Sequence, residues 1–89
     1  MGIGKLKNLS LCHCNIRGLS LEKLRAIETS LSTKYDIITL SETFLSPNST
    51  INLELKGYHP VIRRDRPTFG GGLAIYVKEN ITANIVVGY

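Results

Sequence analysis

The chain has 89 residues, 43% hydrophobic and 20% charged, which excludes a disordered polypeptide and indicates one small domain or part of a larger one. Its net charge of +4 suits a polyanionic partner such as nucleic acid, although many proteins carry as much charge for solubility. The sequence shows no apolar run of membrane-spanning length and no secretory leader, so we expect no membrane association and a nuclear or cytoplasmic location.

The first half of the chain predicts a strand, a helix and a second strand. Residues 9–16 are mostly apolar and end at Arg17 and Gly18, which predicts a strand buried on both faces. A helix is expected from about Leu21 to about Thr33, with Ser20 as its N-cap. Residues 36–40 are short, apolar and rich in β-branched side chains, and they predict the second strand. The apolar stripe of the helix consists of Leu21, Leu24, Ile27 and Leu31.

The second half predicts further, antiparallel strands. Residues 46–49 have loop composition, and residues 51–55 alternate as a short strand or extended segment that Gly57 ends. Residues 58–62 predict a strand, and residues 67–72 a loop before another strand at 73–77. A last β-like run follows at residues 85–87. The expected order is β-α-β-β-β-β, in the α/β (α+β) class.

Two polar side chains follow the paired strands of the first half. A strand–helix–strand unit with a right-handed crossover makes its strands parallel neighbours, so Asn15 and Glu42 should emerge at the same edge of the sheet. Glu42 is there either a ligand for a hard cation such as magnesium or a solvated loop carboxylate. Asn15 either holds a phosphate oxygen or water, or caps the strand at its turn.

The Cys12-His13-Cys14 motif does not predict a zinc site. A strand points both cysteines to one face and His13 to the other, and no second cysteine pair follows. Buried free thiols are the simpler interpretation. His13 and His59 have no Ser, Cys or carboxylate at an informative spacing, which favours packing or surface roles.

Glycines and arginines gather between residues 63 and 72. The run Gly70-Gly71-Gly72 is not a P-loop, because no Gly-Lys-Ser/Thr follows it and a strand comes next; it predicts a turn with close backbone approach. The basic cluster before it is either a phosphate-binding or nucleic-acid-binding surface or a solvated loop. Its members are Arg63, Arg64 and Arg66.

Several segments, taken in order, resemble the endonuclease/exonuclease/phosphatase superfamily. The chain is more closely similar to the apurinic-type endonuclease domain of non-LTR retrotransposon polyproteins. The resemblance covers residues 9–81 and is carried by the whole ordered set more than by any one piece. The segments are Asn15-Ile16-Arg17-Gly18-Leu19, residues 36–45 (DIITLSETFL), Gly57-Tyr58, Arg64-Asp65-Arg66 and residues 70–77 (GGGLAIYV).

The resemblance implies a four-layered α/β sandwich of the DNase I-like type, of which residues 1–89 would be the N-terminal portion. It implies a metal-dependent endonuclease that hydrolyses phosphodiester bonds in DNA, with Glu42 as the magnesium or manganese ligand and Asn15 as an active-site asparagine. Arg17 departs from members that carry an acidic or amide residue at that position, and a phosphate contact is the role we expect for it.

The family's later motifs, including its water-activating groups, have no counterpart in this sequence. We therefore expect the chain alone to be inactive, with its partners in the parent protein being DNA, the C-terminal half of the domain and a reverse transcriptase domain. Two alternatives stay open. One is a truncated, non-catalytic remnant with weak metal or nucleic-acid binding, and the other is a fragment of a phosphatase of the same fold.

Overall fold

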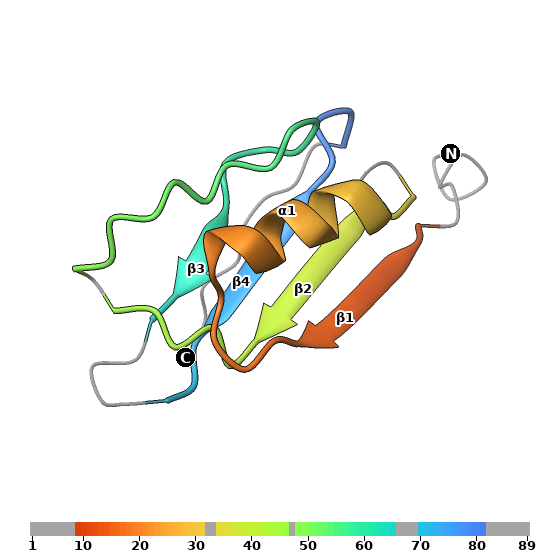
Figure 1. The fold of residues 1–89 in the computed structure, drawn as a ribbon. Helices are drawn as coiled ribbons and strands as arrows, with labels where there is room; N and C mark the ends of the chain where they lie inside the picture. Colours follow the sequence, from red (N-terminus) through yellow and green to blue (C-terminus); the bar gives the residue numbers. More distant parts are fainter. Residues whose placement is uncertain (1–8, 32–33, 47, 66–69, 82–89) are drawn as a thin grey trace.

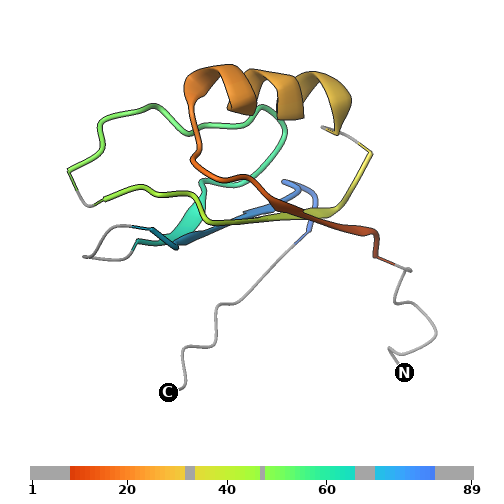
Figure 2. The ribbon, with the colours of Figure 1, turned by 60° about the horizontal axis from the view of Figure 1, so that its bottom comes forward.

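The computed structural model describes residues 9–31, 34–46, 48–65 and 70–81. These residues form a mixed α/β structure in two layers, with a helix packed on one face of a four-stranded sheet (Figures 1 and 2). The predicted α/β class is confirmed. The elements in chain order are β1 (Leu11–Asn15), α1 (Leu21–Ser30), β2 (Ile37–Ser41), β3 (Ile62–Arg64) and β4 (Leu73–Val77).

The sheet has the strand order β1-β2-β4-β3. β1 and β2 are parallel and joined through α1, with Leu11 opposite Ile37 and Asn15 opposite Ser41, as the strand–helix–strand pattern predicts. β4 runs antiparallel to both β2 and β3. The carboxyl ends of β1 and β2 therefore lie side by side at one edge of the sheet.

Helix α1 begins as predicted and ends earlier than predicted. The Ser20 hydroxyl accepts a hydrogen bond from the Lys23 backbone N–H at 3.2 Å, and the helix ends at Ser30 with Leu31 as its C-cap. Leu24 and Ile27 are buried, whereas Leu21, the first residue of the helix, is 49% exposed. Thr33, the expected end, lies outside the described residues. The described part of the chain contains no helix long and apolar enough to cross a bilayer.

The prediction that the first strand is buried on both faces is wrong. β1 lies at the edge of the sheet, and α1 covers one face only (Figure 2). Leu11 is 62% exposed, and His13 and Asn15 are exposed on the same face, whereas Cys14 packs against the core. A continuous apolar run does not reveal that only one face of its strand is covered by another layer.

The strand predicted at residues 58–62 is also misplaced. Tyr58 forms an isolated bridge with Lys78, and regular pairing begins at Ile62, where the predicted strand was to end. Pro60 lies between them and has no N–H to donate. Tyr58 pairs with Lys78 and Ile62 with Ile75, so this segment has one residue more than its partner, as in a bulge.

The other predicted segments of the chain differ in outcome. Residues 51–55 are an extended segment outside the described strands, with Leu53 and Leu55 buried. Residues 36–40 match β2 with a shift of one residue, and residues 73–77 match β4 in full. Residues 85–87 lie outside the described residues.

The core lies between α1, the sheet and the extended segment that ends at Leu55. Ile38, Leu40 and Tyr76 have no exposed surface. The Tyr76 hydroxyl donates a 2.8 Å hydrogen bond to the Leu53 carbonyl, and burial raises the pKa of Tyr76 to about 12 although nearby Arg63 lowers it in part. This bond fixes the extended segment to the sheet.

Candidate functional site

The structure brings Asn15 and Glu42 together at the carboxyl ends of β1 and β2. Asn15 Nδ2 donates a hydrogen bond to Glu42 Oε2 at 3.2 Å. Asn15 is exposed and Glu42 is partly exposed, so both side chains are accessible to a ligand. The predicted convergence of these two residues is confirmed, and their chemical roles stay predictions.

The backbone of Glu42 explains how its carboxylate reaches Asn15. Ser41 is the register partner of Asn15, so regular strand alternation would point the next side chain to the opposite face of the sheet. Glu42 instead has a φ of 56°, in the left-handed region, which ends the alternation. The Glu42 carbonyl accepts a 2.7 Å hydrogen bond from the Gly18 N–H, which holds this conformation.

Unfavourable backbone conformations concentrate at this edge of the sheet. Among the described non-glycine residues, Arg17, Glu42 and Phe44 have positive φ angles, of 49°, 56° and 57°. For a residue other than glycine such a conformation costs on the order of 1–2 kcal/mol. Strain of this kind persists where the surroundings impose it, and it clusters at functional sites.

Lys23 was not predicted as part of the site, but it fixes the loop that follows Asn15. Its Nζ donates hydrogen bonds to the carbonyls of Ile16 at 2.9 Å and Arg17 at 3.2 Å. In the sequence, Lys23 belongs to the polar face of an amphipathic helix. Nothing in that pattern indicates that a lysine in the first turn folds back onto the preceding loop.

Thr43 and Gly72 meet beside the Glu42 backbone. Gly72 has a φ of 98°, and a Cβ at this position would collide with Thr43 Oγ1. The Phe44 N–H donates to the Gly71 carbonyl at 2.9 Å, so the close backbone approach predicted for the triple glycine is confirmed. Thr43 Oγ1 is buried and has no hydrogen-bond partner among the described residues.

His13 lies on the same face of β1 as Asn15 and contacts two hydroxyl groups of β2. Its Nδ1 is 2.5 Å from Thr39 Oγ1, and its Nε2 is 3.3 Å from Ser41 Oγ. The sequence does not indicate this contact between His13 and Ser41, because the two residues are 28 positions apart and only the strand register brings them together. His59 bonds the Ile81 carbonyl at 2.8 Å, which agrees with a packing role.

The four predicted phosphate-binding arginines have different surroundings. Arg17 is exposed in the loop after Asn15. Arg63 forms an ion pair with Asp65 at 2.7 Å and donates to the Ser46 carbonyl at 3.0 Å, so its guanidinium is engaged within its own region. Arg64 is exposed at the end of β3, and Arg66 lies outside the described residues.

The donor atoms at Glu42 suit a hydrated magnesium or manganese ion. Glu42 Oε2 accepts from Asn15, and among the described groups no hydrogen bond occupies the other carboxylate oxygen. Magnesium is commonly held by one or two carboxylates, with water and phosphate oxygens as its other ligands. In the described part of the chain, no three His, Cys, Asp or Glu side chains form a metal-binding cluster, and Glu42 is the carboxylate that the predicted site supplies.

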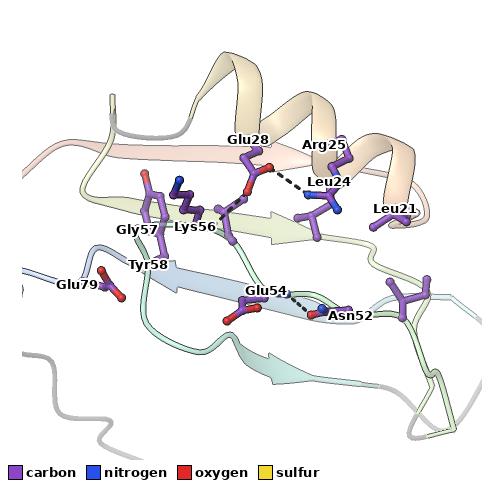
Figure 3. Close-up of a pocket in the computed structure, with 12 residues that line it drawn as sticks. Leu21, Leu24, Arg25, Glu28, Asn52, Glu54, Lys56, Gly57, Tyr58 and Glu79 are labelled. Carbon is purple, nitrogen blue, oxygen red and sulfur yellow. Dashed lines mark hydrogen bonds and ion pairs between the residues drawn. The ribbon is translucent and has the colours of Figure 1, made fainter.

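A groove of about 690 Å³ lies elsewhere, between α1 and the segment around residues 51–58 (Figure 3). Leu24 and Leu55 contribute apolar surface, and the Arg25–Glu28 ion pair of 3.2 Å lies on its helix side. None of the predicted site residues lines this groove. The site at Asn15 and Glu42 lies at the carboxyl ends of β1 and β2, away from this groove.

Comparison with known proteins adds no family to these observations. No protein-family model and no curated protein matches the chain.

Proposed function

We propose that this chain carries the asparagine–glutamate half of a metal-dependent phosphodiesterase site that acts on DNA. The observation that carries the proposal is the hydrogen bond between Asn15 Nδ2 and Glu42 Oε2 at the carboxyl edge of two parallel strands. The parent protein would belong to the retrotransposon branch of the endonuclease/exonuclease/phosphatase superfamily. In that case the four-stranded sheet would be part of a DNase I-like sandwich.

Each residue of the pair has a distinct role in this proposal. Glu42 holds magnesium or manganese through the carboxylate oxygen that Asn15 leaves free. When bound, the ion stabilises negative charge on the oxygens of the phosphate. Asn15 orients the Glu42 carboxylate and faces the phosphate, and exposed Arg17 supplies a positive charge beside it.

Hydrolysis also needs a group that activates water, and the proposal does not assign one to this chain. Among the described residues, the side chains of Asn15 and Glu42 hydrogen-bond to each other, and no further acid or base is hydrogen-bonded to them. We expect the 89-residue chain to bind a divalent ion and not to cleave DNA. In the proposed parent protein, the remainder of the domain and a reverse transcriptase domain would follow.

The lack of a group of three or more metal-binding side chains among the described residues also fits a second candidate, a non-catalytic remnant that binds metal or nucleic acid weakly. The two candidates differ in what happens when the proposed domain is completed. Only the first predicts that a longer chain containing Asn15 and Glu42 cleaves DNA with their help.

Nicking of supercoiled plasmid in magnesium tests the proposal. The 89-residue chain should give no nicking, whereas a chain extended to the full proposed domain should nick. Changing Glu42→Gln in the extended chain should lower the rate by at least about 100-fold, because without this carboxylate ligand the site loses the ion that stabilises charge on the phosphate. Glu54→Gln, which changes an exposed carboxylate on the groove, is the matched control.

Equal nicking by the parent, Asn15→Ala and Glu42→Gln forms of the extended chain would contradict the proposed site. A folded extended chain that does not nick at all would favour the remnant.

A further inference from the structure

Cys12 and Cys14 form a pair of thiols on the core-facing side of β1. Their Sγ atoms are 3.9 Å apart, and both cysteines are free. Both are partly exposed, and Cys14 also packs against the core. β1 is the edge strand of the sheet, so in the described structure a small ion can approach the thiols from the side without a neighbouring strand.

The sulfur separation suits two ligands of one metal ion. Two sulfurs that each lie about 2.3 Å from one ion are at most about 4.6 Å apart, so the separation of 3.9 Å in this structure lets both reach the same ion. The two cysteines therefore need little rearrangement to bind together. Because they are two residues apart in one strand, β1 itself fixes this spacing.

The ligand set selects a soft ion that accepts few ligands. Thiolates favour soft ions such as Cu(I) over magnesium and manganese, which favour oxygen. His13 cannot complete a set of three, because it lies on the opposite face of β1 and contacts Thr39 and Ser41. Structural zinc takes four ligands, and no group of three or more metal-binding side chains exists among the described residues to supply them. Cu(I) is the other ion that thiolates select.

We propose that Cys12 and Cys14 bind one Cu(I) ion as a bidentate dithiolate. Two S–H bonds break, two Cu–S bonds form and two protons leave to solvent, so one Cu⁺ and two thiols give a complex of charge −1. No electron is transferred. Burial, together with the Cys12 thiol, raises the pKa of the Cys14 thiol, so the ion must displace the proton of that thiol.

An anaerobic titration of the protein against the coloured Cu(I)–bicinchoninate complex tests the proposal. The parent chain should remove one Cu(I) per monomer, and Cys12→Ser and Cys14→Ser should each weaken binding by about 100-fold, because the second attachment becomes unavailable. His13→Ala is the matched control within the same motif. It should retain the parent affinity, since His13 points away from the thiols.

Equal affinity of the parent and either serine variant would overturn the proposal, as would a loss of affinity in His13→Ala as large as in the serine variants. Native mass spectrometry gives a check that does not depend on variants. One Cu(I) in a monomer supports the dithiolate, whereas one Cu(I) shared between two chains contradicts it. Protection of both cysteines from iodoacetamide in the copper-loaded parent also supports it, and unprotected thiols contradict it.

Discussion

The helix-covered core and the carboxyl edge of β1 and β2 differ in burial and in backbone conformation. In the core, Leu40 and Tyr76 have no exposed surface. At the edge, Asn15 is exposed, and Arg17 and Glu42 have positive φ angles. Core packing supplies the stability of the fold. That stability offsets the cost of the unfavourable backbone conformations at the edge. Such a division is expected where binding residues are positioned by a rigid scaffold.

The largest effect should come from a cavity in the core. Leu40→Ala should lower the free energy of unfolding by about 2–5 kcal/mol, because it removes a fully buried side chain from the central strand β2. Leu11→Ala, at a position 62% exposed on β1, should change it by no more than about 0.5 kcal/mol. Urea unfolding measures both. Equal losses would show that the open face of β1 contributes as much stability as the covered core.

High pH should weaken the core through Tyr76. The pKa of Tyr76 is raised to about 12 in the folded chain, whereas an unfolded tyrosine has a pKa of about 10. The folded state therefore keeps a proton that the unfolded state loses. This contribution is complete below about pH 10 and declines as the pH rises toward about 12, by roughly 2–3 kcal/mol in total.

The measurement for Tyr76 is the difference between the unfolding free energies of the parent and Tyr76→Phe as a function of pH. The contributions of all other titrating groups to the unfolding free energy are the same in both proteins and cancel in this difference. It should shrink between about pH 10 and pH 12. A constant difference across this range would mean that Tyr76 titrates normally and is not held in a desolvated core.

Gly72→Ala should destabilise the edge by on the order of 1–3 kcal/mol, because its φ is 98° and the added Cβ collides with Thr43 Oγ1. Gly57→Ala is the matched control, with a φ of 89° and no heavy atom within 4 Å of the added Cβ. Gly57→Ala should lower the free energy of unfolding by only about 1 kcal/mol, which is the cost of the positive φ without a collision. Thermal or urea unfolding of the two variants isolates the collision, and equal losses would mean that Thr43 moves aside freely.

The smallest effect should be a gain in stability. Arg17→Gly should raise the free energy of unfolding by about 0.5 kcal/mol, since glycine adopts the φ of 49° without strain but loses more chain entropy on folding. Arg25→Gly, in the interior of α1, should lower it by about 1 kcal/mol. If Arg17→Gly is as destabilising as Arg25→Gly, the loop after Asn15 is not strained.

Much of the fold could be predicted because it follows from short-range patterns. The bounds of β4, the Ser20 cap and the parallel pairing of β1 with β2 all come from apolar runs, a capping residue and crossover handedness. The interruption between Tyr58 and Ile62 was missed, although Pro60 was a usable signal for it. The exposure of Leu11 could not be read from the sequence, because it depends on the place of β1 in the sheet.

The candidate site was predictable to a smaller extent. Strand ends alone indicated that Asn15 and Glu42 would meet, and they do. The left-handed backbone of Glu42 has no local signal, since glycine and asparagine are the residues that normally adopt it. The contacts of His13 with Ser41 and of Lys23 with the Ile16 carbonyl arise from register and from loop closure, which no spacing in the sequence specifies.

The most direct test of the central claim is the position of a bound hard cation, measured from the broadening of amide NMR signals by substoichiometric manganese(II). We predict that the signals of Asn15, Glu42 and their chain neighbours broaden first, that Glu42→Gln abolishes this and that Glu54→Gln preserves it. Broadening that is unchanged in Glu42→Gln, or that centres on another part of the chain, would contradict the assignment of Glu42 as the metal ligand.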